Sequence, residues 1–226
     1  MTYLVFDTET TGVDVHNDRI VQLFIMAMTD DGTVENTWEW IINPGVPIPE
    51  GASAVHGFTD EFVQQNGDDP YAALLEAYDV FEEYWNATWV AYNLNFDLSI
   101  LDAEFARHDV YPRFGQGVAL FVDMFDPLVV DRAKDKYRKG KRTLEAVAPH
   151  YGVQFDPEQA HKADYDVEIT GKVALAMIGK YGVPSTVQQA GWYASWAKGL
   201  ETYLQKSDPE AQVDSQWPYR SRLVTK

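Results

Sequence analysis

The stretch "YLVFDTETTG" (residues 3–12) places two carboxylates directly behind a short apolar run. Tyr3 to Phe6 predict a buried strand. Residues two apart on a strand point the same way, so Asp7 and Glu9 project together if the extended conformation continues to Glu9. Two carboxylates in partly dry surroundings resist ionising side by side. The pair therefore indicates a positive partner, and hard divalent cations prefer such oxygen ligands.

Two further clusters are needed, because acid-x-acid pairs recur by chance in a chain with 35 acidic residues. In "VAYNLNFDLSIL" (residues 90–101) a strand is followed by a polar turn, and we expect Asp97 to open a helix. In "HKADYDVEIT" (residues 161–170) His161 stands five residues ahead of Asp166. Each has an ordinary alternative, since acids cap helix starts and a lone His is commonly a surface residue. Asp164 is a rival to Asp166, although the spacing favours Asp166.

The remaining pattern predicts an α/β fold with a mixed five-stranded sheet flanked by helices. Asp31-Gly32 is a hairpin signal between two strands, and "NPGVPIPEGAS" (residues 43–53) reads as a loop. The further strands are expected over 19–29, 34–42, 88–92 and 118–122. The helices are expected over 59–65, 71–85, 97–108, 143–150 and 165–181. Within 71–85 the residues at core-facing spacing are Leu74, Leu75, Tyr78, Phe81 and Trp85.

Composition limits the class of protein. The chain has 226 residues, is 46% hydrophobic and contains no cysteine, so disulfides and thiolate metal sites are excluded. The longest apolar stretch, Ile20 to Met28, contains Gln22 and is too short to span a bilayer. No signal-peptide pattern is present at the N-terminus. We expect a soluble cytoplasmic protein that does not bind membranes.

The formal net charge of −17 argues against a nucleic-acid partner, because cations supply most nonspecific affinity for phosphates. The charge is unevenly distributed, however. "RAKDKYRKGKR" (residues 132–142) holds seven of the 18 Lys and Arg residues and one acid. It is either a solvated face or a local cationic rim. The candidates for contacts with a nucleic-acid backbone are Arg138, Lys139, Lys141 and Arg142.

The pattern changes from Pro184 onward. Trp192, Trp196 and Leu200 fall four apart on one helical face, and the last residues read as an irregular tail. The tryptophans either pack back onto the domain or form a docking face for a partner protein. We therefore divide the chain into a domain over 1–183 and a helical C-terminal extension with its tail over 184–226.

Taken in order, the motifs resemble the DEDDh (DnaQ-like) 3′→5′ exonucleases, the family of the epsilon proofreading subunit of bacterial DNA polymerase III. The resemblance covers most of residues 1–181 and rests on "FDTETTG", "VHGFTDEFV", "NLNFDLSIL" and "HKADYDVEIT". Each motif is weak alone, and the set is specific. Two departures stand out: Tyr92 where many relatives carry His, and Lys162 where a subgroup carries a Tyr base.

The resemblance implies a ribonuclease H-like fold that uses two divalent cations, Mg²⁺ or Mn²⁺. The matching metal ligands are Asp7, Glu9, Asp97 and Asp166, and His161 matches the general base. By the same match, the pocket for the 3′-terminal nucleotide is lined by Thr10, Thr11, His56, Gly57, Asn93 and Phe96.

The implied function is a metal-dependent 3′→5′ exonuclease that releases nucleoside 5′-monophosphates from a 3′ end. Single-stranded DNA is the expected substrate, in a proofreading-like role in a bacterial or phage-infected cell. A polymerase or replisome partner is possible for such a protein. Three alternatives stay open: a noncatalytic replisome accessory on the same fold, an exonuclease that trims RNA or oligoribonucleotides, and a phosphohydrolase of small phosphoesters.

Overall fold

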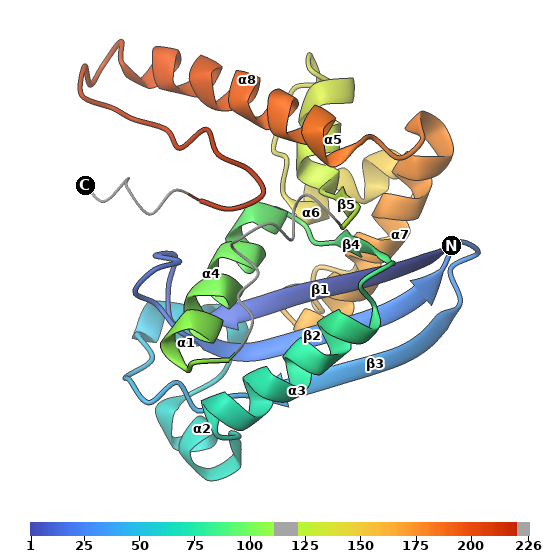
Figure 1. Cartoon of the computed structure of the whole chain (residues 1–226). Coiled ribbons are helices and arrows are strands. Elements are labelled where there is room, and N and C mark those ends of the chain that lie inside the picture. The colour runs from blue at the N-terminus through green and yellow to red at the C-terminus, as the bar shows by residue number, and fades with distance from the viewer. Residues whose placement is uncertain (111–121, 221–226) are drawn as a thin grey trace.

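A computed structural model describes residues 1–110 and 122–220, and it contains a mixed five-stranded sheet with the order β3-β2-β1-β4-β5 (Figure 1). The strands are β1 (Thr2–Thr10), β2 (Ile20–Thr29), β3 (Val34–Ile41), β4 (Thr88–Val90) and β5 (Met124–Phe125). Pairing is antiparallel from β3 through β1 and parallel from β1 through β5. The expected α/β class and five-stranded mixed sheet are confirmed.

Helices cover both faces of this sheet (Figure 1). Those described are α1 (Glu50–His56), α2 (Asp60–Asn66), α3 (Pro70–Glu83), α4 (Leu94–Arg107), α5 (Pro127–Lys134), α6 (Leu144–Val147), α7 (Ala163–Tyr181) and α8 (Thr186–Leu204). A short 3₁₀ helix spans Pro149–Tyr151.

The alternation of side chains along β1 divides the core in two. Leu4 and Phe6 belong to the cluster that packs under α3 and α4, where Phe6 meets Phe81 edge-on at 5.2 Å. Tyr3 and Val5 belong to the cluster under α7. Because residues two apart share a face, Asp7 and Glu9 lie on the α7 side and Thr8 lies on the α4 side. The strand does run to Thr10, as the Asp7–Glu9 argument required.

Several expected boundaries are wrong. Helix α4 begins at Leu94, so Asp97 lies within its first turn instead of opening it. Residues 50–56 form α1 where a loop was expected, and α5 was not expected at all. Leu75 is exposed, because the buried face of α3 is narrower than its pattern suggested. The strand expected over 118–122 lies almost wholly outside the described residues.

The extension packs back onto the domain. Gln189, Tyr193 and Ala197 of α8 are buried, and the Gln189 amide donates to the Met124 carbonyl at 2.6 Å. Beyond α8 the chain turns back toward α4 (Figure 1), where Trp217 is buried in the core. Helix α8 and the tail up to residue 220 are therefore part of the same packed body.

Nowhere in 1–110 or 122–220 is there a helix with the length and apolar character needed to cross a membrane.

Close packing of α7 on the sheet depends on Gly171. A Cβ atom at this position would lie 2.6 Å from the Met28 sulfur and 3.4 Å from Val5. Gly179, two turns later on the same helix, is exposed and has nothing within 4 Å of that position.

The two glycines give a matched test of this packing. We expect Gly179→Ala to stabilise the protein by up to about 1 kcal/mol, because alanine favours helix over glycine. Gly171→Ala should lose this gain, since overpacking a core costs about 1–3 kcal/mol. Urea unfolding of the two variants measures the difference. Equal stabilisation by both would contradict the close approach.

Candidate active site

Four carboxylates from three elements converge at one end of the sheet. Asp7 and Glu9 come from β1, Asp97 from the first turn of α4, and Asp166 from the first turn of α7. Because β1 and β4 are parallel, the turn that leads into α4 reaches the edge where β1 ends. Helix α7 crosses the other face of β1. The sequence set is thus brought together by three separate packing relations.

These carboxylates oppose one another's ionisation. Burial raises the pKa of Asp7 well above its ordinary value, and the charges of Asp97, Glu9 and Asp166 raise it further. Burial, followed by the charges of Asp166 and Asp97, raises the pKa of Glu9 to about 8. Such a set is stable in the charged form only with a compensating positive charge.

Thr8 holds Asp97 in place, a role that sequence reasoning missed. The Thr8 hydroxyl and backbone N–H donate to the same oxygen, Oδ1 of Asp97, at 2.7 and 3.0 Å. Burial raises the pKa of Asp97 to about 7, and these two bonds act against that rise. The only available signal was the alternation of β1, which puts Thr8 on the α4 side.

His161 lies beside Asp166 at the start of α7. It is exposed, and its left-handed backbone (φ 63°) turns the chain into the helix. Its backbone N–H donates to Oδ2 of Asp166 at 3.1 Å. Burial raises the pKa of Asp166, whereas this bond and the His161 charge act to lower it. Asp164, the rival acid, is exposed.

The chemistry of these donors fits divalent cations. Four carboxylates carry a formal charge of −4, which two such ions would balance, and Oδ1 of Asp166 is buried without a hydrogen-bond partner. Among the described residues, no three of these carboxylates have ligand oxygens within 4.8 Å of one another. Two ions about 3.5–4 Å apart need a wider spread of oxygens than one ion does.

A second acidic cluster is better explained as an ion-pair network. Asp131, Asp135 and His150 do have ligand atoms within 4.8 Å of one another. Oδ2 of Asp131, however, accepts from both Arg138 and Arg142, and its Oδ1 accepts from the Tyr151 hydroxyl at 3.1 Å. With its oxygens occupied by donors, Asp131 is a poor cation ligand.

Asp126 organises the chain next to the site and was also missed. This buried side chain caps α5 and accepts from the backbone N–H groups of Asn93 and Leu94. It also accepts from the Trp217 indole at 3.4 Å. Burial raises its pKa to about 6, and the donors act against that rise. The Asp-Pro pair at 126–127 was a helix-start signal that could have revealed it.

The residues matched to the nucleotide pocket fall into two groups. Thr10, His56 and Gly57 form the first group: the His56 imidazole approaches the Thr10 backbone, and Gly57 ends α1 with a φ of 82°. Thr11 is buried, and its hydroxyl already has two partners: it donates to Asp18 and accepts from the Arg19 N–H.

Asn93 and Phe96, the second group, lie at the start of α4. Asn93 has a left-handed backbone and is only half-buried. Phe96 packs partly on the core, and the Arg220 guanidinium lies 5.1 Å from its ring centre. The C-terminal tail thus brings a cation to Phe96.

The four cations proposed for backbone contacts do not form one group. Arg138 and Arg142 pair with buried Asp131 and are mostly covered. Lys139 and Lys141 are exposed. Arg138 and Arg142 therefore have a structural role, and Lys139 and Lys141 remain candidates for contacts with a nucleic-acid backbone.

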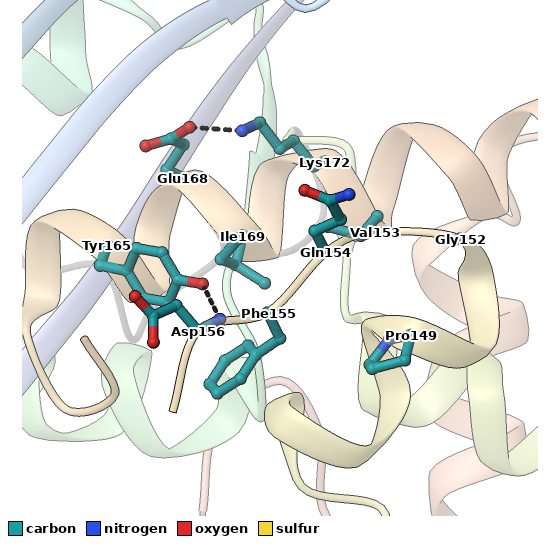
Figure 2. Close-up of a pocket in the computed structure, with 10 residues that line it drawn as sticks. All are labelled: Pro149, Gly152, Val153, Gln154, Phe155, Asp156, Tyr165, Glu168, Ile169 and Lys172. Carbon is teal, nitrogen blue, oxygen red and sulfur yellow. Dashed lines mark hydrogen bonds and ion pairs between the residues drawn. The ribbon is translucent and has the colours of Figure 1, made fainter. Parts of the chain in front are cut away.

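A cavity of about 710 Å³ lies away from the carboxylates, between α7 and the segment 149–156 (Figure 2). Figure 2 shows Glu168 paired with Lys172, and the Tyr165 hydroxyl accepting from the Asp156 N–H. Asp166 is about 100° around the helix from Tyr165. Since Glu168, Lys172 and the Tyr165 hydroxyl are paired with one another or with the backbone, we assign this cavity no chemistry.

Residues 4–174 match the RNase T family, which is described as exonucleases. The chain is also 30% identical over 192 residues to the PolC-type DNA polymerase III of Streptococcus pyogenes, a match that covers 83% of this chain and 12% of the polymerase. It therefore spans a small part of the curated relatives it matches.

Solved structures with the same fold include two exonucleases. E. coli exonuclease I in complex with a dT13 oligonucleotide superposes with a TM-score of 0.65 at 21% identity, over 80% of this chain and 41% of that one. Exonuclease X in complex with 5′ overhanging duplex DNA superposes with a TM-score of 0.56 at 22% identity. The match covers 81% of this chain and 95% of that one.

Carboxylate repulsion predicts a pH-dependent stability without metal. A folded-state pKa raised above the unfolded value favours the fold at low pH, and that stability is lost as pH rises through the folded pKa. With EDTA present, the melting temperature should therefore fall between about pH 5 and pH 8. Asp7→Asn should melt higher than wild type at pH 8, by about 2–4 °C per kcal/mol of repulsion relieved.

The control is Mg²⁺, which should raise the melting temperature of wild type more than that of Asp7→Asn. A lower melting point for Asp7→Asn in EDTA at pH 8 would contradict the repulsion.

Proposed function

The chain belongs to the RNase T family of exonucleases, and from this premise we propose that it hydrolyses phosphodiester bonds stepwise from the 3′ end of single-stranded DNA, releasing nucleoside 5′-monophosphates. The observation that carries the proposal is the convergence of Asp7, Glu9, Asp97 and Asp166, with His161 beside the last. A scaffold without catalysis has no need for four mutually repelling carboxylates.

The family uses two divalent cations, and the four carboxylates are the residues that would hold them. When bound, such ions lower the pKa of an attacking water and stabilise the attacking and leaving oxygens of the transition state. Asp97 enters the site already oriented, because Thr8 fixes one of its oxygens. Asp166 keeps one oxygen without a hydrogen-bond partner and therefore available to a cation.

His161 is proposed as the general base that takes the proton of the attacking water. Its exposed position allows it to pass that proton to solvent. Its attachment to Asp166 through the backbone N–H keeps it at the cation site. A neutral imidazole is needed for this step.

Recognition of an end requires walls around the terminal nucleotide. We propose that Phe96 and Asn93 on one side, and His56 with the Thr10 backbone on the other, form these walls. Stacking of a base on an aromatic ring contributes about 1–3 kcal/mol. DNA is proposed as the substrate because both solved structures described above are DNA complexes and the curated relative is a DNA polymerase.

The polymerase relatives also support a proofreading-like setting, with a polymerase as partner. We propose that residues 1–183 carry the catalysis and that 184–226 complete the body around α4 and α5.

The activity is tested with a 5′-labelled single strand and Mg²⁺, with and without EDTA. A metal-dependent ladder that shortens from the 3′ end is expected. Matched DNA and RNA strands compare the sugars, since the 2′-OH distinguishes them. No shortening of either strand would refute the proposal, and release of phosphate from small esters alone would favour a different phosphohydrolase.

His161→Ala should lower the single-turnover rate by about 10²–10⁴-fold, the usual contribution of a general base. The fold should survive, because the side chain is exposed. Lys162→Ala is the matched control, since this neighbour occupies the position of the alternative base and should keep its activity. If His161→Ala cleaved at the wild-type rate, the role assigned to His161 would be wrong.

A further inference from the structure

Two sequence features that the active site does not use meet in one groove. The cationic run over 132–142 and the tryptophans of α8 line a depression of about 650 Å³ between α5 and α8. Figure 1 shows these two helices packed together at one end of the molecule, beyond the sheet. The groove residues that matter here are Arg132, Lys136, Arg142, Trp192, Trp196 and Leu200.

The tryptophans orient cations instead of leaving open apolar faces. The Arg132 guanidinium lies over the Trp196 ring at 3.6 Å from its centre, and the Lys134 ammonium lies 4.9 Å from the centre of Trp192. Tyr193 packs against Trp196 at 5.4 Å. A guanidinium stacked on a ring keeps the N–H donors at its edge free for an anion. The groove therefore presents oriented positive charge.

Arg132 and Lys136 are not held in ion pairs among the described residues, although the charge of Asp126 acts on Arg132. In the part of the chain that the structure describes, no acidic side chain forms an ion pair with either of them. Arg142, by contrast, pairs with Asp131 and donates to the carbonyls of Asp131, Asp135 and Arg138. Arg142 shapes the loop, while Arg132 and Lys136 are available to a ligand.

The loop is tied to the active site by Tyr92. Its hydroxyl donates to the Arg142 carbonyl at 2.6 Å, across 50 residues of sequence. Tyr92 immediately precedes Asn93 in the turn that leads to Asp97. The residue that departs from the family pattern therefore joins the cationic loop to the wall of the proposed nucleotide pocket.

We propose that the α5–α8 groove is a second binding site for the substrate strand, in which Arg132 and Lys136 bind backbone phosphates upstream of the 3′-terminal nucleotide. Tyr92 is a positioning residue that sets the groove against the active site. The inference rests on the proposed function and adds to it. A chain of net charge −17 repels a polyanion overall, so a strand gains most where cations are concentrated and unpaired.

A nucleic-acid strand fits this groove better than an acidic peptide with an apolar anchor. Cations already cover one face of Trp192 and one of Trp196, so the rings present positive charge beside their apolar surface. Phosphates need donors and charge, and the groove offers both.

The test compares Arg132→Gln/Lys136→Gln with wild type on a long oligo(dT) and on a dinucleotide that is too short to reach the groove. The KM for oligo(dT), relative to that for the dinucleotide, should rise about tenfold. The slope of log affinity against log salt should fall by about 0.7 for each phosphate contact removed. Tyr92→Phe should raise the same KM ratio, and it should change the salt slope less than the double variant does. An unchanged ratio and slope in the double variant would overturn the proposal.

The matched control is Lys198→Gln, an exposed cation of α8 that does not line the groove. This variant should change neither the KM ratio nor the salt slope. If its effect equalled that of the double variant, the affinity would come from overall charge, and the groove would be refuted as a site.

Binding of a fluorescent oligo(dT) in EDTA separates the two proposals, because it needs no cleavage. Weaker binding by the double variant supports the groove even if no strand is degraded, an outcome that would refute only the exonuclease activity. A labelled peptide of Asp, Glu and Phe is the competing probe. If wild type bound this peptide and not oligo(dT), the groove would be a peptide site and the inference would fall.

Discussion

The mutual repulsion of four carboxylates is the constraint around which the rest of the molecule is arranged. Asp7 experiences burial and three negative neighbours at once. A fold tolerates such a group only when the supporting elements are stable enough to hold it and a cation can compensate it. The supporting elements here are the central strand β1, with helices packed on both of its faces, and the parallel neighbour β4.

Hydrogen bonds from the backbone set the exact positions within that frame. Thr8 fixes Asp97 from β1, and the His161 N–H fixes Asp166 from the turn into α7. Asp126 then joins the turn at Asn93 to α5 and to the C-terminal tail through Trp217. The geometry of the site is therefore coupled to parts of the chain that lie beyond the family match, which ends at residue 174.

The acidic character of the chain and its proposed affinity for a polyanion are reconciled by the positions of the cations. Asp131 uses two arginines of the cationic run to shape the loop, and Arg132 and Lys136 of the same run line a groove. The tryptophans, for which the sequence allowed packing or docking, pack on the domain and hold Arg132 and Lys134 in orientation.

The sequence by itself determined the α/β class and the central strand, which follow from local rules: alternation on β1 and hairpin chemistry at Asp31-Gly32. It indicated the acidic set through the resemblance of its motifs, taken together, to a known family. It could not reveal the bonds that Thr8 and Asp126 make to residues 89 and 33 positions away. It also could not separate Arg138 from Lys139, because local charge does not say which cation meets a buried carboxylate. Only tertiary packing brings distant donors, acceptors and charges within reach of one another, and that is what decided the shape of the site.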